Sequence, residues 1–251
     1  MKNKKASNVT TYYIGVITAI NAVNGGLATP AANMTQTRYA AVTRLAVSDI
    51  LNRITQLNPP LPPNVKIAIL EASSFGVSEG IVDAILGFYN NNISKPIALT
   101  GSTVPVETMT GSIISGVYKL PLFGPTSAVS QLSSKLDYPY FTRGRNSDIA
   151  AVIPILTLAK YMNWNKLCLV AADQFYGQGI LGNITIESVQ RGILLYTSMY
   201  SGLFTPDVVI NSARLSFRNL IQNYDCRIFI LHSPITFASY AIQAAGLEGI
   251  L

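Results

Sequence analysis

The sequence predicts an α/β fold in which parallel sheets are covered by helices on both faces, and three observations lead to that class. Short apolar runs recur along the chain and are continuous rather than alternating, which is typical of parallel strands buried on both faces. Between them lie segments with an apolar residue every three or four positions, as in helices that cover a sheet. Strands and helices alternate almost throughout, which predicts open, doubly wound sheets with right-handed crossovers.

The elements follow one another in a regular order. The predicted strands are Tyr12 to Ile20, Val65 to Leu70, Pro96 to Thr100, Leu120 to Phe123, Tyr138 to Thr142, Leu167 to Ala172, Ile193 to Met199 and Cys226 to Leu231. The predicted sheet-facing helix positions are Val42, Leu45, Ala46, Ile50 and Ile54; Ile81, Ile85, Phe88 and Tyr89; Met109, Ile113 and Val117; Val152, Ile155, Ala159 and Met162; Ile180, Leu181 and Ile184; Phe217, Leu220 and Ile221; and Phe237, Ala241 and Ala245. Asn58-Pro-Pro-Leu-Pro-Pro is expected to end the first helix as a stiff loop.

The rhythm of strands and helices is interrupted around Gly144 to Ser147, and we place a lobe boundary there. Lobe 1 is predicted to span residues 10–143 and lobe 2 residues 148–251. A chain of 251 residues with 49% hydrophobic residues can fill the cores of two such lobes.

The charge pattern argues against a nucleic-acid partner. The net charge of +6 comes from 18 Lys and Arg against 12 Asp and Glu, spread thinly rather than clustered. No apolar run reaches the roughly 18 residues that a membrane-spanning helix needs, so a membrane is expected only through a part outside this chain. Residues 1–32 have the outline of a secretory signal, but a polar gap at Ser7 to Thr11 favours a first strand instead.

Cysteine and histidine are too scarce for a metal site. Cys168 and Cys226 lie in apolar strand-like runs, so we interpret them as buried packing residues rather than as ligands or a disulfide, and they do not indicate a compartment. There is one His, the acids are scattered, and no phosphate-binding loop occurs. We therefore expect no metal and no cofactor.

The predicted strand ends carry hydroxyl groups where an enzyme would place acids, bases or metal ligands. In open α/β sheets ligands bind beyond the carboxyl ends of the strands. Here those ends read Glu71-Ala-Ser-Ser74, Gly101-Ser-Thr103, Gly124-Pro-Thr-Ser127, Asp173-Gln-Phe-Tyr176 and His232-Ser233. This composition favours capture of a small polar molecule by hydrogen bonds, although turns and helix caps also use such residues.

Two motifs suggest an enzyme, and both are weak. Gly76-Val-Ser-Glu-Gly80 matches the nucleophile elbow of α/β-hydrolases, with Ser78, Asp173 and His232 in the order of that triad. The elbow glycine is not at the strand end, so Ser78 is better read as a helix N-cap and His232 as a loop residue. Gly177-Gln-Gly-Ile-Leu-Gly182 matches a dinucleotide-binding fingerprint but lacks the acid that should follow.

Four segments carry a family resemblance: PIALTGS, LPLFGPTSAVSQLSSK, YPYFTRGRNSD and YMNWNKLCLVAADQFYGQG. From about Tyr12 onward the chain resembles the receptor-family ligand-binding region, found in the ectodomains of class C G-protein-coupled receptors and natriuretic-peptide receptors. It is similar also to bacterial amino-acid-binding proteins of the same type I periplasmic-binding fold. The resemblance implies two lobes that close on a ligand, no catalysis, and a place on the extracellular face of the plasma membrane. A solute-binding protein of an ABC importer, periplasmic or secreted, is the alternative.

The resemblance also implies which residues bind the ligand. Thr126 and Ser127 in the loop after the fourth strand would hold a carboxylate, while Asp148 and Tyr176 would help to hold an ammonium group. Ser102 and Thr103 in the loop after the third strand would contribute hydroxyls, and Ser233 would line the lobe 2 wall. A dimer through lobe 1 is also expected.

Two departures from the family pattern qualify these expectations. Ungapped matching puts Val106 where the amino-acid receptors have a carboxylate-binding serine, so either Ser102 and Thr103 replace that serine or the ligand is not an α-amino acid. The chain also stops on a helix after three lobe 2 strands, and the second lobe is expected to be incomplete.

Overall fold

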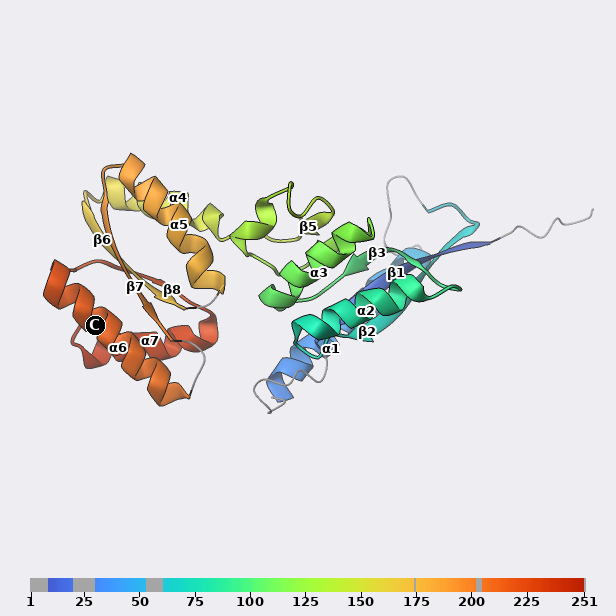
Figure 1. Ribbon diagram of the computed structural model, residues 1–251, viewed down its shortest axis with the longest axis horizontal. Coiled ribbons are helices and arrows are strands. Elements are labelled where there is room, and N and C mark those ends of the chain that lie inside the picture. Colours follow the sequence, from blue (N-terminus) through green and yellow to red (C-terminus); the bar gives the residue numbers. More distant parts are fainter. Residues whose placement is uncertain (1–8, 20–29, 53–60, 174, 202–204, 251) are drawn as a thin grey trace, which may run out of the picture. The chain divides into compact units, whose positions relative to one another are not determined.

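The computed structural model describes residues 9–19, 30–52, 61–173, 175–201 and 205–250, which form two compact units (Figure 1). The first unit, lobe 1, comprises Met1–Ser127 and Ser134–Arg145, and the second unit, lobe 2, comprises Ala128–Ser133 and Asn146–Leu251. The chain passes from lobe 1 into lobe 2 for the last time between residues 145 and 146, within the predicted boundary at 144–147. The predicted lobe ranges placed 128–133 in lobe 1, whereas by its contacts this short segment belongs with lobe 2.

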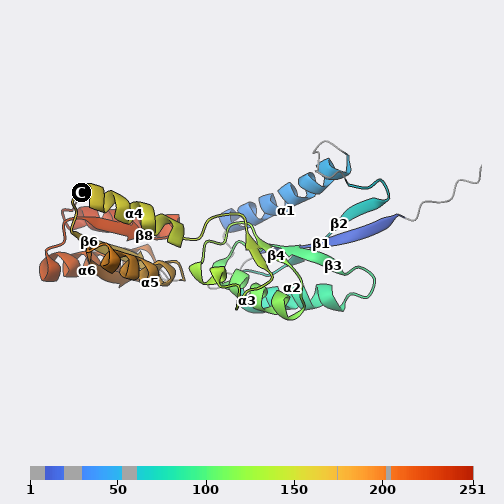
Figure 2. The same ribbon diagram turned by 90° about the horizontal axis from the view of Figure 1, so that it is seen from above.

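The described part of lobe 1 contains a five-stranded sheet in which every neighbouring pair is parallel, in the order β2-β1-β3-β4-β5. Helices α2 and α3 lie on one face of the sheet and α1 on the other (Figure 2). Its elements are β1 (Thr10–Thr18), α1 (Pro30–Leu51), β2 (Val65–Ser73), α2 (Ser78–Asn90), β3 (Pro96–Thr100), α3 (Pro105–Val117), β4 (Leu122–Gly124) and β5 (Phe141–Arg143). The predicted loop at 58–63 falls largely outside the described residues.

Helix α3 turns an unexpected face toward the sheet. The predicted face of Met109, Ile113 and Val117 is wrong, because Ile113 is 52% and Val117 69% exposed. The buried residues of α3 are instead small or polar: Glu107, Thr108, Gly111, Ser112 and Ser115. A Cβ at Gly111 would lie 2.5 Å from Ile81 Cδ1, so a larger residue at this close approach would require the Ile81 side chain to shift.

Helix α1 also differs from the predicted face, since Val42 and Leu45 are 63% and 60% exposed. The buried residue among those whose side chains are described on this helix is Ala40. For α2 the prediction is correct for Ile81, Ile85 and Phe88, which are buried, and wrong for Tyr89, which is 38% exposed.

Lobe 2 has a three-stranded parallel sheet among the described residues, in the order β7-β6-β8. Helices α4 and α5 cover one face, and α6 and α7 cover the other (Figure 1). Its elements are a 3-10 helix (Ser130–Ser133), α4 (Ile149–Tyr161), β6 (Lys166–Ala172), α5 (Phe175–Gln190), β7 (Leu194–Tyr200), α6 (Pro206–Tyr224), β8 (Phe229–His232) and α7 (Ile235–Leu247). All eight predicted strands and seven predicted helices are present, so the α/β class is confirmed.

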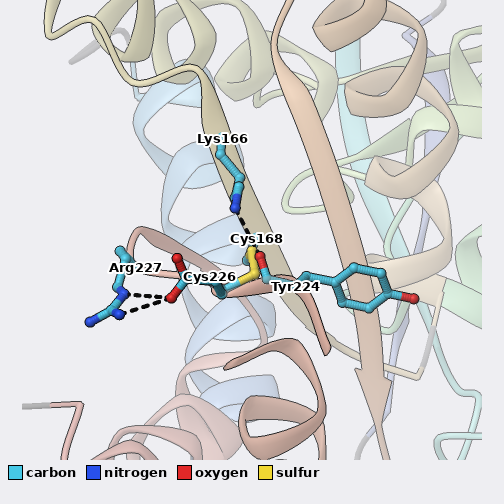
Figure 3. Close-up of a disulfide and its surroundings, with 6 residues drawn as sticks. Lys166, Cys168, Tyr224, Cys226 and Arg227 are labelled. Carbon is cyan, nitrogen blue, oxygen red and sulfur yellow. Dashed lines mark hydrogen bonds and ion pairs between the residues drawn. A yellow bond between two sulfur atoms is a disulfide. The ribbon is translucent and has the colours of Figure 1, made fainter. Parts of the chain in front are cut away.

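The two cysteines form a disulfide, so the prediction that they are unpaired packing residues is wrong (Figure 3). Cys168 lies in β6 and Cys226 between α6 and β8, with their Cα atoms 6.1 Å apart. Both are buried in the core beneath α6 and α7, as predicted. Lys166 donates a hydrogen bond to the Tyr224 carbonyl at 2.9 Å and holds the same two segments together at the surface. No local sequence pattern indicates this pairing, because the cysteines are 58 positions apart.

Candidate functional site

The four candidate residues of lobe 1 lie beyond the carboxyl ends of two neighbouring strands. Ser102 and Thr103 follow β3, and Thr126 and Ser127 follow β4. The strands pair in parallel, and the Gly101 N–H donates to the Phe123 carbonyl at 3.1 Å, which continues the pairing to the strand ends. A Cβ at Gly101 would lie 1.9 Å from the Ile17 carbonyl oxygen, so only glycine fits where β3 ends against β1.

Ser102 is fully buried, and its hydroxyl is engaged within the protein. The hydroxyl donates a short hydrogen bond to Oε2 of Glu107 and accepts one from the Val104 N–H at 3.0 Å. Thr103, the next candidate, is half-buried. Of these two predicted hydroxyls, that of Ser102 therefore serves an internal contact in this structure.

Thr126 and Ser127 differ from Ser102 in this respect. Their hydroxyl oxygens are both buried, and neither has a hydrogen-bond partner in the structure. Buried hydroxyls are nearly always hydrogen-bonded, because burying one without a partner costs about 1–3 kcal/mol. The end of β4 therefore holds two adjacent polar groups with unused hydrogen-bonding capacity.

The three candidates of lobe 2 are placed on three different elements. Asp148 precedes α4 and is half-buried, and its backbone N–H donates to the Ala128 carbonyl at 2.9 Å. Tyr176 is in the first turn of α5, and its side chain lies outside the described part of the chain. Ser233 follows β8 and is half-buried.

Ser233 pairs with a residue that the sequence analysis missed. The Tyr200 hydroxyl, at the end of β7, donates to the Ser233 hydroxyl at 2.6 Å, and Ser233 in turn donates to the Pro234 carbonyl at 3.1 Å. Burial raises the pKa of the Tyr200 phenol, and its hydrogen bond with Ser233 acts in the opposite direction. Tyr200 therefore remains a neutral donor that orients Ser233 at the strand-end face of lobe 2.

Glu107 is the other residue that sequence reasoning missed. It is fully buried in the first turn of α3, where its Oε2 atom accepts hydrogen bonds from Ser102 and, at 2.8 Å, from Ser74. Burial raises the pKa of the Glu107 carboxyl, while the hydrogen bonds from Ser102 and Ser74 act in the opposite direction. One signal for it was present, since Glu107, Gly111 and Ser115 are spaced as one helix face.

The residues of the hydrolase alternative are divided between the two lobes. Ser78 is the first residue of α2, one position after the N-cap Val77, and its hydroxyl accepts a hydrogen bond from Thr110 at 3.3 Å. Asp173 and His232 belong to lobe 2, where His232 ends β8 and is not in a loop as predicted.

Neither a metal cluster nor a membrane span is found in the part of the chain that the structure describes. No group of three or more His, Cys, Asp or Glu side chains is placed to hold a metal ion there. None of the helices described combines the length and the apolar character needed to cross a bilayer. What the strand ends can supply is hydrogen bonding by hydroxyl groups and backbone.

Comparison with known proteins agrees with the α/β fold. The receptor family ligand binding region matches residues 38–250. Since this match covers most of the sequence, the chain belongs to that family, and the predicted periplasmic-binding-protein-like type I fold is confirmed.

The similar proteins are receptors of much greater length. Glutamate receptor 3.1 of Oryza sativa subsp. japonica is 28% identical over 198 residues, which is 76% of this chain and 20% of the receptor. Glutamate receptor 2.3 of Arabidopsis thaliana is 22% identical over 203 residues, or 81% of this chain and 22% of the receptor. The metabotropic glutamate receptor-like protein E of Dictyostelium discoideum is 24% identical over 107 residues, or 42% of this chain and 13% of that protein. The chain thus spans about a fifth of the length of its longest-matching relatives.

Proposed function

We propose that this chain is the extracellular ligand-binding region of a membrane receptor. It binds a small polar molecule, amino-acid-like or an organic acid, between its two lobes, and closure of the lobes on the ligand is the signal. Membership in the receptor family supports the binding role. The receptor names of the relatives favour this role over the importer alternative.

The observation that carries the proposal is the pair of buried hydroxyls at the end of β4. The hydroxyls of Thr126 and Ser127 are shielded from water and have no partner within the protein. A ligand carboxylate could accept both of their hydrogen bonds, and a hydrogen bond to a charged group contributes about 1.5–3 kcal/mol. In this proposal Asp148 and Tyr176 hold the ligand's ammonium group, while Thr103 and Ser233 add further hydrogen bonds.

The disulfide supports the proposed location outside the cell. Disulfides such as Cys168–Cys226 form and persist in oxidising compartments and are rare in the cytosol. As unpaired residues, the two cysteines gave no indication of the cellular compartment. Their pairing now favours the extracellular face of a membrane, or secretion, over the cytosol.

The exposed face of α3 supports a dimer through lobe 1. Ile113 and Val117 project from the same side of this helix, four residues apart, and α3 has no exposed charged residue. Two copies of this face can therefore pair about a twofold axis without repulsion between like charges. We propose a second copy of the chain as the partner.

Isothermal titration calorimetry of the purified chain tests the ligand class. The panel comprises the twenty L-amino acids, succinate, lactate and citrate, each titrated at pH 7. Saturable binding of at least one carboxylate-bearing compound is expected, and its methyl ester or amide should bind at least tenfold more weakly. Absence of binding across the panel would contradict the proposal.

A labelling experiment tests the absence of catalysis. A fluorophosphonate probe reacts covalently with the activated serine of a hydrolase, so the intact mass of the chain should be unchanged after incubation. Specific labelling of Ser78 would overturn the receptor interpretation in favour of the hydrolase.

A further inference from the structure

Glu107 is the one Asp, Glu, Lys, Arg or His side chain that is fully buried among the residues the structure describes. Its Oε1 atom has no hydrogen-bond partner in the structure. Burial of a carboxyl group is unfavourable, and an apolar side chain of similar size would fill the same space more favourably. A carboxyl at this place therefore needs an explanation beyond packing.

The contacts of Glu107 connect two loops that are distant in the sequence. Its Oε2 atom accepts from Ser74 Oγ in the β2–α2 loop and from Ser102 Oγ in the β3–α3 loop. The Ser74 N–H donates to the Thr18 carbonyl at the end of β1 at 2.9 Å. One oxygen of Glu107 thereby joins the ends of three adjacent strands, β2, β1 and β3.

Other residues in the first turn of α3 strengthen this link between the two loops. Thr108 Oγ1 lies 3.1 Å from the Ser102 carbonyl oxygen and 2.9 Å from that of Val104 and shares its one hydrogen between them, so the start of α3 also fixes the β3–α3 loop. Glu107 lies in the first turn of α3, where the helix dipole favours a negative group. The Gly101 N–H bond to Phe123 extends the same arrangement to β4, the strand that precedes Thr126 and Ser127.

We propose that Glu107 is a positioning residue of the ligand site, which holds the β2–α2 and β3–α3 loops in one arrangement through Ser74 and Ser102. This inference rests on the proposed ligand-binding function. Its consequence for Ser102 is specific: that hydroxyl acts on the ligand only through Glu107, while Thr126 and Ser127 contact the ligand directly.

Four variants of the chain test this proposal. Glu107→Met keeps the side-chain volume and removes both accepting contacts, Glu107→Gln keeps an accepting oxygen, Ser102→Ala removes one donor, and Ser127→Ala removes a proposed ligand contact. Ser112→Ala is the matched control, because this buried α3 serine donates its hydrogen bond to the Thr108 carbonyl within the same helix. The probes are L-glutamate, L-alanine and succinate, with affinity measured by calorimetry and loop opening by hydrogen–deuterium exchange of residues 74–78 and 101–104.

The expected result is a pattern of coupled losses. Glu107→Met and Ser102→Ala should each weaken ligand binding at least fivefold and speed hydrogen exchange in both loops. Because both changes break the same link, the affinity of the double variant should be no lower than that of the single variant that binds more weakly. Glu107→Gln stays within threefold of the wild type. In the Ser127→Ala/Glu107→Met double variant, the fold-losses of affinity of the two single variants should multiply, because they affect separate interactions.

Two results would overturn the inference: losses of Ser102→Ala and Glu107→Met that multiply, or a Glu107→Gln variant as weak as Glu107→Met. If the wild type binds none of the probes, the ligand class proposed above fails, and the exchange measurement alone decides the role of Glu107. In that case the link is supported if Glu107→Met and Ser102→Ala speed exchange in both loops to the same extent and the double variant speeds it no further. Unchanged exchange in the single variants refutes the link.

Discussion

The Ser127 side chain has the surroundings expected of a ligand-binding hydroxyl, because it is 1% exposed and its oxygen has no partner in the protein. Ser127→Ala removes this unpaired hydroxyl, so it should leave the stability of the free chain unchanged or raise it, while weakening ligand binding by about 1–3 kcal/mol. Calorimetry with the best compound of the panel measures the affinity, and circular dichroism follows thermal unfolding. Ser115→Ala, which removes a hydroxyl bonded to the Ser112 carbonyl within α3, serves as the control. An unchanged affinity in Ser127→Ala would mean that this hydroxyl belongs to a turn only.

The raised pKa of Glu107 predicts a pH dependence of stability with a definite sign. Because burial raises this pKa above its ordinary value of 4.5, the folded chain binds the proton more tightly than the unfolded chain does. The resulting stabilisation is full below the unfolded pKa and is lost as the pH rises through the folded pKa. Glu107→Gln removes this dependence, so its stability relative to the wild type should increase from pH 4 to pH 8.

Urea unfolding at pH 4, 6 and 8, followed by circular dichroism, measures this difference. Glu79→Gln, which changes an exposed acid on α2, is the matched control and should show no comparable trend. Parallel pH profiles for the wild type and Glu107→Gln would show that the buried carboxyl does not change its protonation in this range.

At the scale of elements, the disulfide joins β6 to the segment that enters β8 and closes a loop of 58 positions. The Cys168→Ala/Cys226→Ala double variant should lower the stability of lobe 2 by about 2–4 kcal/mol, because the unfolded chain loses a constraint. Trp164 is the sole tryptophan and packs against a lobe 2 core, so its fluorescence reports unfolding of this lobe.

Thiol titration provides the independent check on this pairing. Denatured wild-type chain should show no free thiol before reduction and two afterwards. A reductant should destabilise the wild type and leave the double variant unaffected. Two free thiols in the unreduced chain would contradict the pairing.

At the scale of the whole molecule, the α3 face predicts self-association. Ile113→Glu/Val117→Glu places charges on both sides of the proposed twofold contact and should convert a dimer to a monomer in sedimentation velocity. Leu136→Glu is the control, since Leu136 is 92% exposed in lobe 1 but lies in the β4–β5 loop. A double variant that sediments like the wild type would exclude α3 as the contact.

Closure of the lobes is the second prediction at this scale. A ligand shifts an open-to-closed equilibrium only by its extra affinity for the closed form, and a nearly complete shift takes on the order of 5.5 kcal/mol. A few charge-assisted hydrogen bonds made on closure could supply this difference. Tyr176→Ala should therefore reduce the ligand-induced compaction seen by small-angle scattering more than it reduces initial capture by lobe 1. Tyr161→Ala, at an 82% exposed tyrosine of α4, is the control, and equal compaction in both variants would contradict a role in closure.

The order and type of the elements could be predicted from the sequence because they depend on local patterns. Continuous apolar runs such as that at Leu167 to Ala172 indicate buried parallel strands, and the spacing of Ile81, Ile85 and Phe88 indicates a helix face. The hydroxyls at the strand ends could be found for the same reason, since parallel strands bring their carboxyl ends to one edge of a sheet.

Only the tertiary structure decided what those residues contact. The inward face of α3 follows from the close approach of Gly111 to Ile81, which admits small side chains and turns Ile113 and Val117 outward. The difference between Ser102 and Ser127 depends on Glu107, whose carboxyl reaches one hydroxyl and not the other. The sequence by itself determined the α/β elements, their order and the strand-end hydroxyls, because these arise from neighbouring residues. The α3 face, the Glu107 link and the Cys168–Cys226 bond were decided by the folded chain, because each joins residues that local periodicity does not relate.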